Sequence, residues 1–238
     1  IKEDKFYMIE VNPRASRTIP FLSKCIGNSL AKIASKVITG KSLKDLGFEA
    51  EIMPTNYAVK APVFPFNKFR KVDPILGPEM KSTGEVMGRG DCFGEAFGKA
   101  MKGAGEIIPT KGRVFVSVKD NDKKYLPDLC SKLEKLGFQI YATKGTAKAL
   151  EKTDVNVKII NKVLEGRPHI VDAILNKEID MIINTTEGRQ SIKDSFSIRR
   201  SALEHSIFLT TTISGGFAIV ESLEKGVENW EYKPLQLS

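Results

Sequence analysis

The feature that most constrains the fold is an alternation of strand-like and helix-like segments from about residue 112 onward. Short apolar runs typical of strands lie at 113–118, 138–142, 155–160, 179–183 and 206–209. Apolar residues at helical spacing occur between and after them, at 126–136, 146–150, 170–175, 192–203 and 216–223. Strands joined by helices of this size pair in parallel through right-handed crossovers. The sequence therefore predicts an α/β fold, an open doubly wound sheet of five parallel strands.

The first hundred residues predict a different, α+β kind of structure. Residues 6–11 alternate apolar and polar side chains, which indicates a strand. Apolar residues recur at helical spacing across 21–37, which predicts a helix with one buried face, and 94–103 is typical of a short helix. The intervening part is loop-rich and less regular.

A domain boundary is expected at Gly103-Ala104-Gly105, because clustered glycines are typical of a hinge. We therefore expect two domains, 1–104 and 105–238. The chain starts with Ile1 and an ordered-looking pattern follows almost at once, so we expect a piece of a longer protein.

The balance of charges and cysteines narrows the class of protein. The net charge of +8 favours phosphate or polyanion ligands, although a solvated lysine-rich surface is the simpler explanation. The three cysteines are far apart and form no CxxC pair, and there are only two histidines, which argues against a disulfide framework or a zinc site. This pattern fits the reducing cytoplasm.

Neither nucleic acid nor membrane is an expected partner. Basic and aromatic residues do not interleave as they do in RNA-binding sheets. The most apolar stretch, 207–220, is broken by threonines and glycines, whereas a membrane-spanning helix needs about 20 mostly apolar residues.

A first group of candidate site residues follows the strand expected at 6–11. Glu10 and Asn12 are two residues apart and so would project to the same face of a strand. A carboxylate beside an amide oxygen suits Mg²⁺ or Mn²⁺ held between nucleotide phosphates. Arg14 and Arg17 are placed to stabilise anionic oxygens during phosphoryl transfer. The alternative is a strand end with surface salt bridges.

A second group of polar residues follows the strands of the predicted sheet. The carboxyl ends of parallel strands meet at one edge, where open α/β sheets bind ligands. Threonine hydroxyls, lysines and helix amides donate to phosphate oxygens, so a mononucleotide phosphate fits. Taken singly, each of these residues is equally well explained as a helix cap or a solvated side chain. The group comprises Lys123, Thr143, Thr146, Lys162, Asn184 and Thr186.

Several long motifs resemble one enzyme family. The runs EVNPRASRTIPFLSKCIG and PFNKFRKVDPILGPEMKSTGEVMGRG are similar to the carbamoyl-phosphate synthase large subunit. The segments YATKGTA, NKVLEGRPHIVDAI and IINTTEGRQSIKDSFSIRRSAL resemble the methylglyoxal-synthase-like regulatory domain of that family. The resemblance implies that 1–104 is the C-terminal part of the second ATP-grasp domain and that 105–238 is the allosteric domain.

The resemblance also implies an activity. The intact enzyme would be an ATP-dependent, glutamine-hydrolysing ligase that makes carbamoyl phosphate from bicarbonate, glutamine-derived ammonia and ATP, for pyrimidine and arginine synthesis. Glu10 and Asn12 would bind Mg²⁺ or Mn²⁺, and Arg14 and Arg17 would face carbamate and phosphate as catalytic residues. Implied partners are the rest of the large chain and a glutaminase small subunit, in a homo-oligomer of heterodimers. Because other ATP-site residues of the family lie upstream of this sequence, we expect the segment alone to be inactive.

In the regulatory domain, the resemblance implies that the six residues after the strands hold UMP, an inhibitor, or IMP, an activator. Relatives that ornithine activates carry a glutamate next to the lysine that matches Lys60, and this chain has Ala61 there. A threonine that contacts ornithine is retained as Thr211. We therefore expect ornithine not to be an effector.

Two other functions stay open. A methylglyoxal-synthase-type lyase needs a carboxylate as general base, but the loop NTTEGRQ after the fourth strand contains no Asp and offers only Glu187. A nucleic-acid-binding module would account for the positive charge and predicts steeply salt-dependent binding to polynucleotides.

Overall fold

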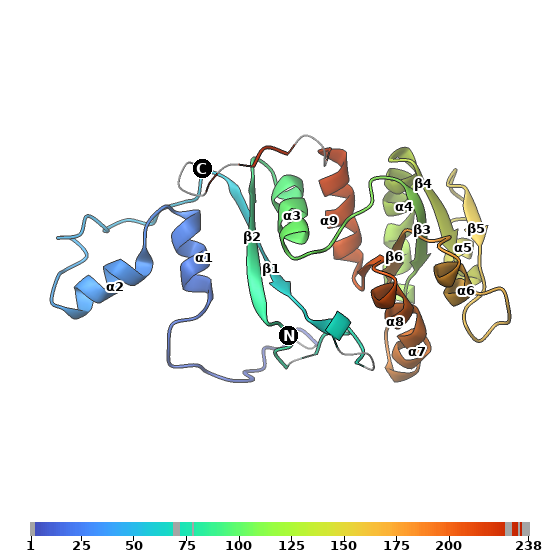
Figure 1. The fold of residues 1–238 in the computed structure, drawn as a ribbon, viewed down its shortest axis with the longest axis horizontal. Helices are drawn as coiled ribbons and strands as arrows, with labels where there is room; N and C mark the ends of the chain where they lie inside the picture. Colours follow the sequence, from blue (N-terminus) through green and yellow to red (C-terminus); the bar gives the residue numbers. More distant parts are fainter. Residues whose placement is uncertain (1–2, 69–71, 78, 227–229, 233, 235–238) are drawn as a thin grey trace. The chain divides into compact units, whose positions relative to one another are not determined.

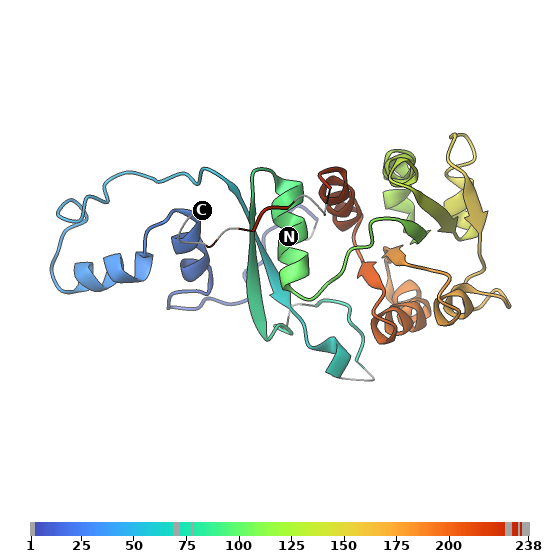
Figure 2. The ribbon, with the colours of Figure 1, turned by 45° about the horizontal axis from the view of Figure 1, so that its top comes forward.

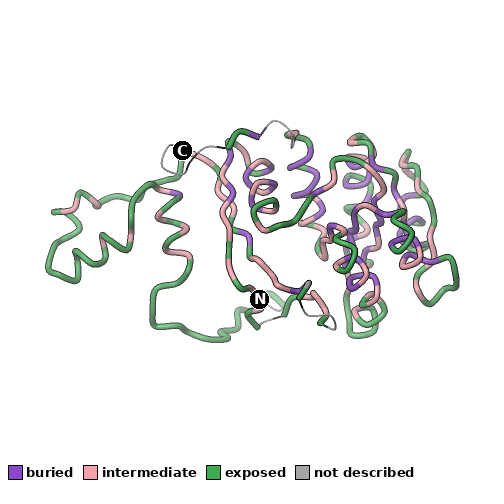
Figure 3. The backbone as a smooth tube through the Cα atoms, viewed as in Figure 1, coloured by how far each residue is buried: buried purple, intermediate pink, exposed green. Residues whose placement is uncertain are grey.

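The computed structural model describes residues 3–68, 72–77, 79–226, 230–232 and 234 (Figure 1). The chain divides into two compact units, Ile1–Asn56 with Lys233–Ser238, and Tyr57–Tyr232. In the first unit nearly all described residues are exposed or half-buried, whereas buried backbone is concentrated in the second (Figure 3).

The first unit contains two short helices, α1 (Thr18–Cys25) and α2 (Leu30–Ile38). The single helix expected across 21–37 is wrong, because the chain turns between them. Gly27 has a φ of +69°, a left-handed conformation that glycine adopts at little cost. Ser29 then begins a new helix, since its side chain accepts a hydrogen bond from the Lys32 amide.

The strand expected at 6–11 is also wrong. These residues have no regular secondary structure, and Phe6, Met8 and Ile9 are more than 80% exposed. An alternating pattern becomes a strand only when a neighbouring strand takes up its backbone hydrogen bonds. Within the part of the chain that the structure describes, no strand pairs with 6–11.

The second unit begins with an antiparallel pair of strands covered by a helix (Figure 2). Strand β1 (Tyr57–Val63) pairs with β2 (Gly84–Gly90), and the short 3₁₀ helix η1 (Phe66–Lys68) follows β1. Helix α3 (Phe93–Gly103) packs on both strands. The approach is close, because a Cβ atom on Gly88 would lie 2.0 Å from the Ala96 carbonyl oxygen.

The predicted five-stranded parallel sheet is confirmed. Its order is β5-β4-β3-β6-β7, with every pair parallel. The strand that comes first in the chain, β3, lies at the centre, and the later strands are added on both sides of it. The sheet is therefore doubly wound. The strands are β3 (Gly112–Ser117), β4 (Phe138–Ala142), β5 (Val157–Ile159), β6 (Met181–Asn184) and β7 (Phe208–Thr210).

Helices cover both faces of this sheet. Val114 and Val116 of β3 pack into the core under α4 (Leu126–Lys135) and α9 (Ile213–Glu224). Phe115, which points to the opposite face, packs with α6 (Ile170–Leu175) and α8 (Phe196–Glu204). The α3 helix also contacts α9, so the strand pair is attached to one face of the sheet.

The shorter helices lie in the connections. They are η2 (Asp120–Tyr125), α5 (Lys144–Lys148) and α7 (Arg189–Asp194). The single helix expected at 192–203 is wrong, because α7 ends at Asp194 and α8 begins at Phe196. Among the described residues, no helix has the length and apolarity to cross a membrane. The domain boundary at 103–105 stays a prediction.

Candidate functional site

The loops that follow strands β3, β4, β5 and β6 line one cavity of about 530 Å³. These loops leave the carboxyl ends of parallel strands, where open α/β sheets carry their ligand sites. Residues of α7 and the start of α8 form the remaining wall. The cavity is therefore enclosed by five separate parts of the second unit.

Four of the six expected effector residues line this cavity, namely Thr143, Lys162, Asn184 and Thr186. Thr146 lies directly behind them, because the Thr143 hydroxyl donates to its Oγ1 atom at 3.3 Å. Both threonines are 2% exposed. The Val118 amide also donates to Thr146 Oγ1 at 3.3 Å, so this threonine joins the β3 loop to the β4 loop.

Lys123, the sixth residue, lies beside the cavity rather than in its wall. Its Nζ atom is 2.7 Å from the carboxylate of Asp120. The hydrogen bond from Lys123 holds the pKa of Asp120 below its usual value, and the charges of Lys123 and, to a smaller extent, Lys162 add to this effect. The positive charges of Lys123 and Lys162 therefore both reach the Asp120 carboxylate, beside the cavity.

Asn184 is the residue of the cavity wall that points most directly to a ligand. It is the last residue of β6, is 2% exposed and lies in the cavity wall. Its side-chain Nδ2 atom is buried and has no hydrogen-bond partner among the described residues. Buried donors are nearly always paired in folded proteins, so an unpaired donor on a residue of the cavity wall is consistent with an acceptor that the protein does not supply.

The rim contains residues that the sequence reasoning missed. The backbone amide of Lys119 donates to Thr185 Oγ1 at 3.0 Å, which ties the β3 loop to the β6 loop. Lys119 Nζ lies 4.0 Å from Glu187 Oε2, and the Asn121 side chain is 3.5 Å from the same carboxylate oxygen. The position of Lys119 directly after a strand was the signal that could have identified it.

The four candidate residues of the first unit are all exposed. Asn12 Nδ2 donates to Glu10 Oε1 at 3.0 Å, so these two side chains are neighbours. Arg14 Nη1 donates to the adjacent Ala15 carbonyl at 3.3 Å, and Arg17 directly precedes α1. Across the described residues, no three side chains of the His, Cys, Asp and Glu types form a metal-binding cluster.

The position associated with ornithine has a different pairing. Ala61 is 1% exposed and offers no carboxylate. Lys60 Nζ lies 3.4 Å from Glu85 Oε2 on the neighbouring strand β2. Thr211 is half-buried just after β7.

Comparison with known proteins agrees with this architecture. Residues 126–211 match the family described as MGS-like domain, so the five-stranded part is an α/β domain of the MGS-like class. Residues 1–46 match the family described as carbamoyl-phosphate synthase L chain, ATP binding domain.

Similarity to individual proteins extends over nearly the whole chain. The chain is 61% identical to the carbamoyl phosphate synthase large chain of Pseudomonas putida over 228 residues. These residues make up 96% of this chain and 21% of that relative. The large chain of Vibrio cholerae is 53% identical, over 92% of this chain and 20% of its own length. The large chain of Buchnera aphidicola is 52% identical, over 100% of this chain and 22% of its own length. The resemblance to the carbamoyl phosphate synthase large chain is thus confirmed, and the chain spans about a fifth of the length of these relatives.

Proposed function

We propose that the second unit is the effector-binding part of a carbamoyl phosphate synthase large chain and that its cavity binds a nucleoside monophosphate of the UMP or IMP type. The unpaired Nδ2 donor of Asn184 in the cavity wall is the observation that supports this most directly. Lys162, Thr143 and Thr186 line the same space, which brings positive charge and hydroxyl groups to a single ligand.

The charges around the cavity favour a singly phosphorylated ligand over a polyanion. Lys119 and Lys162 line it together with three carboxylates, those of Glu165, Glu187 and Asp194. Because these carboxylates outnumber the lysines, a compact phosphate must be held by local donors such as Lys162 and the threonine hydroxyls, and an extended run of phosphates would be repelled by the carboxylates. The cavity is therefore better suited to a mononucleotide than to a nucleic-acid backbone.

We further propose that the first unit contributes to an ATP-dependent ligase site in the intact enzyme. Asn12 Nδ2 donates to Glu10 Oε1, so the two side chains are neighbours. With the Asn12 amide turned, its oxygen and the Glu10 carboxylate would offer hard oxygen donors of the kind that fit Mg²⁺ or Mn²⁺. The metal, when bound, would neutralise phosphate charge during transfer. Arg14 and Arg17 are near enough in sequence to hold carbamate and phosphate anions.

The proposed substrates of the whole enzyme are bicarbonate, glutamine-derived ammonia and ATP, and its partners are the rest of the large chain and a glutaminase small subunit. Nucleotide binding would regulate it by favouring one of two conformations of the enzyme. An effector shifts such a balance only by its difference in affinity for the two, typically about 1–3 kcal/mol. The segment from Lys60 to Gly90, with the hinge glycines near 103–105, would transmit the change.

A thermal-shift panel on the full-length large chain tests the ligand class. The ligands are UMP, IMP, ornithine and a short oligonucleotide, each over a range of salt concentrations. We expect a mononucleotide at 100 times its dissociation constant to stabilise the native state by about 2.7 kcal/mol, and ornithine to have no effect. Stabilisation by the oligonucleotide alone, falling steeply with salt, would contradict the proposal and favour a nucleic-acid module.

A further inference from the structure

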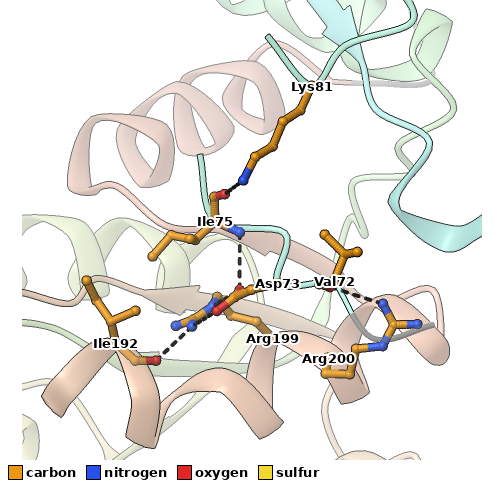
Figure 4. A network of polar contacts seen from close by, with 7 residues as sticks. All are labelled: Val72, Asp73, Ile75, Lys81, Ile192, Arg199 and Arg200. Atoms are coloured by element: carbon orange, nitrogen blue, oxygen red, sulfur yellow. Dashed lines mark hydrogen bonds and ion pairs between the residues drawn. The ribbon is translucent and has the colours of Figure 1, made fainter. Parts of the chain in front are cut away.

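A polar network attaches the cavity wall to the segment that precedes β2 (Figure 4). Arg199 of α8 is completely buried, and its Nε and Nη2 atoms donate to the two carboxylate oxygens of Asp73 at 2.8 and 2.5 Å. Two parallel hydrogen bonds between a guanidinium and a carboxylate fix both partners in orientation as well as distance. Residues 126 apart in the sequence are thus held together.

At one end this network reaches the cavity through α7. Arg199 Nη2 also donates to the carbonyl oxygen of Ile192 at 2.8 Å. Ile192 belongs to the same short helix as Gln190 and Ser191, and both of these line the cavity. Arg199 Nη2 thus donates both to the Ile192 carbonyl and to the Asp73 carboxylate, so a ligand that moves α7 moves one of the two acceptors of this donor.

At the other end the network reaches the β1–β2 pair. Asp73 Oδ1 accepts a hydrogen bond from the Ile75 amide at 3.2 Å, and Lys81 Nζ donates to the Ile75 carbonyl at 3.0 Å. Only two residues separate Lys81 from the start of β2 at Gly84. Arg200 Nη1, which contacts the Val72 carbonyl at 3.4 Å, adds a second attachment between α8 and the same segment.

We propose that the Asp73–Arg199 pair is the contact that transmits effector occupancy from the cavity to the β1–β2 strands. The inference rests on the proposed nucleotide site, and both residues act as positioning residues, because neither lines the cavity. Arg199 Nη1 is buried without a hydrogen-bond partner among the described residues, so one guanidinium donor is left for the second arrangement that this proposal requires. A contact with two discrete arrangements is what coupling between distant sites requires.

The test compares Asp73→Asn with wild type in the full-length large chain bound to its small subunit. Asparagine keeps the shape of aspartate but removes its charge and one strong acceptor. We expect the dissociation constants of UMP and IMP to stay within about twofold, because Asp73 does not line the cavity. The effect of saturating nucleotide on the KM for ATP, typically about 5- to 150-fold in coupled systems, should fall towards none. Asp73→Glu, which restores the carboxylate, should recover part of it.

Asp180→Asn is the matched control. Asp180 pairs with Arg113 through an Nε to Oδ2 distance of 3.1 Å, and the two residues lie at the amino ends of β6 and β3, at the opposite edge from the cavity. This variant should keep the full nucleotide effect. A second variant, Lys81→Met, leaves the Asp73–Arg199 pair intact and removes the next link, so it should reduce the nucleotide effect even if Asp73→Asn folds poorly.

The outcomes separate the two proposals. Wild-type enzyme that binds no mononucleotide refutes the proposed function and this inference with it. If wild type binds and responds while either Asp73→Asn or Lys81→Met responds to the full extent, the nucleotide site stands and the Asp73–Arg199 route is refuted.

Discussion

Asn184 and Lys123 have opposite roles at the proposed site. Asn184 has a buried donor without a protein acceptor among the described residues, whereas Lys123 is already paired with Asp120. A phosphate that uses Lys123 must compete with that carboxylate. The Asp120 side chain is 93% exposed, so water weakens the pair and the competition costs little.

Replacing Asp120 with asparagine should therefore tighten mononucleotide binding. Lys123 would then be available to the ligand phosphate, and the gain should be about two- to fivefold in the dissociation constant, since exposed ion pairs are weak. Isothermal titration with UMP measures it. Asp128→Asn, which removes a comparable exposed carboxylate 3.0 Å from Lys132 on α4, is the control and should change the affinity little. Unchanged or weaker binding by Asp120→Asn would contradict this prediction, because Asp120 would then not compete with the ligand for Lys123.

The types of residues at the site were predictable, but their pairing was not. Thr143, Lys162 and Asn184 follow strands, and the rule that strand ends share an edge brings them together from sequence alone. Lys119 is tied to Thr185 through a backbone amide, and Arg199 is paired with Asp73 across 126 positions. Such contacts depend on tertiary packing, which local periodicity does not record.

At the scale of elements, the sheet was predictable and the N-terminal strand was not. Each strand of the sheet is a short apolar run bounded by a helix pattern, and a parallel strand buried on both faces needs nothing more. Residues 6–11 carry an equally good alternation, but a strand also needs a partner, and the pattern contains no information about one. In the same way, apolar spacing across 21–37 could not show that Gly27 and Ser29 divide the helix.

Gly88 in β2 allows helix α3 to pack closely on the strand, because it has no side chain. Gly88→Ala should destabilise the second unit by about 1–3 kcal/mol or more, because the added Cβ would lie 2.0 Å from the Ala96 oxygen and 2.5 Å from the Ala100 nitrogen. Gly84→Ala in the same strand is the control, since its Cβ would meet no heavy atom within 4 Å. Urea unfolding of both variants measures the difference. Equal stability would mean that α3 does not pack closely on β2.

On the scale of the whole molecule, we propose different tasks for the two units. The first unit offers exposed oxygen and guanidinium groups, which we propose form a catalytic site together with the rest of the large chain. The second unit contains a cavity within its own fold, and partly buried polar contacts link the wall of that cavity to the segment that precedes β2. We therefore propose that regulation begins when a ligand binds the cavity at the carboxyl ends of the strands in the second unit. The activity that this binding changes would lie elsewhere in the intact enzyme.

Calorimetric titration of UMP and IMP into the full-length large chain and two lysine variants tests whether the cavity at the strand ends is the nucleotide site. Lys162→Ala removes a charge from the cavity wall, whereas Lys158→Ala removes the same charge from β5 at a position outside the cavity. We predict that Lys162→Ala weakens binding by at least about tenfold, the order expected when a charged hydrogen bond worth about 1.5–3 kcal/mol is lost, and that Lys158→Ala binds like wild type. Equal affinities for both variants would contradict the account, because the cavity at the strand ends would then not be the nucleotide site.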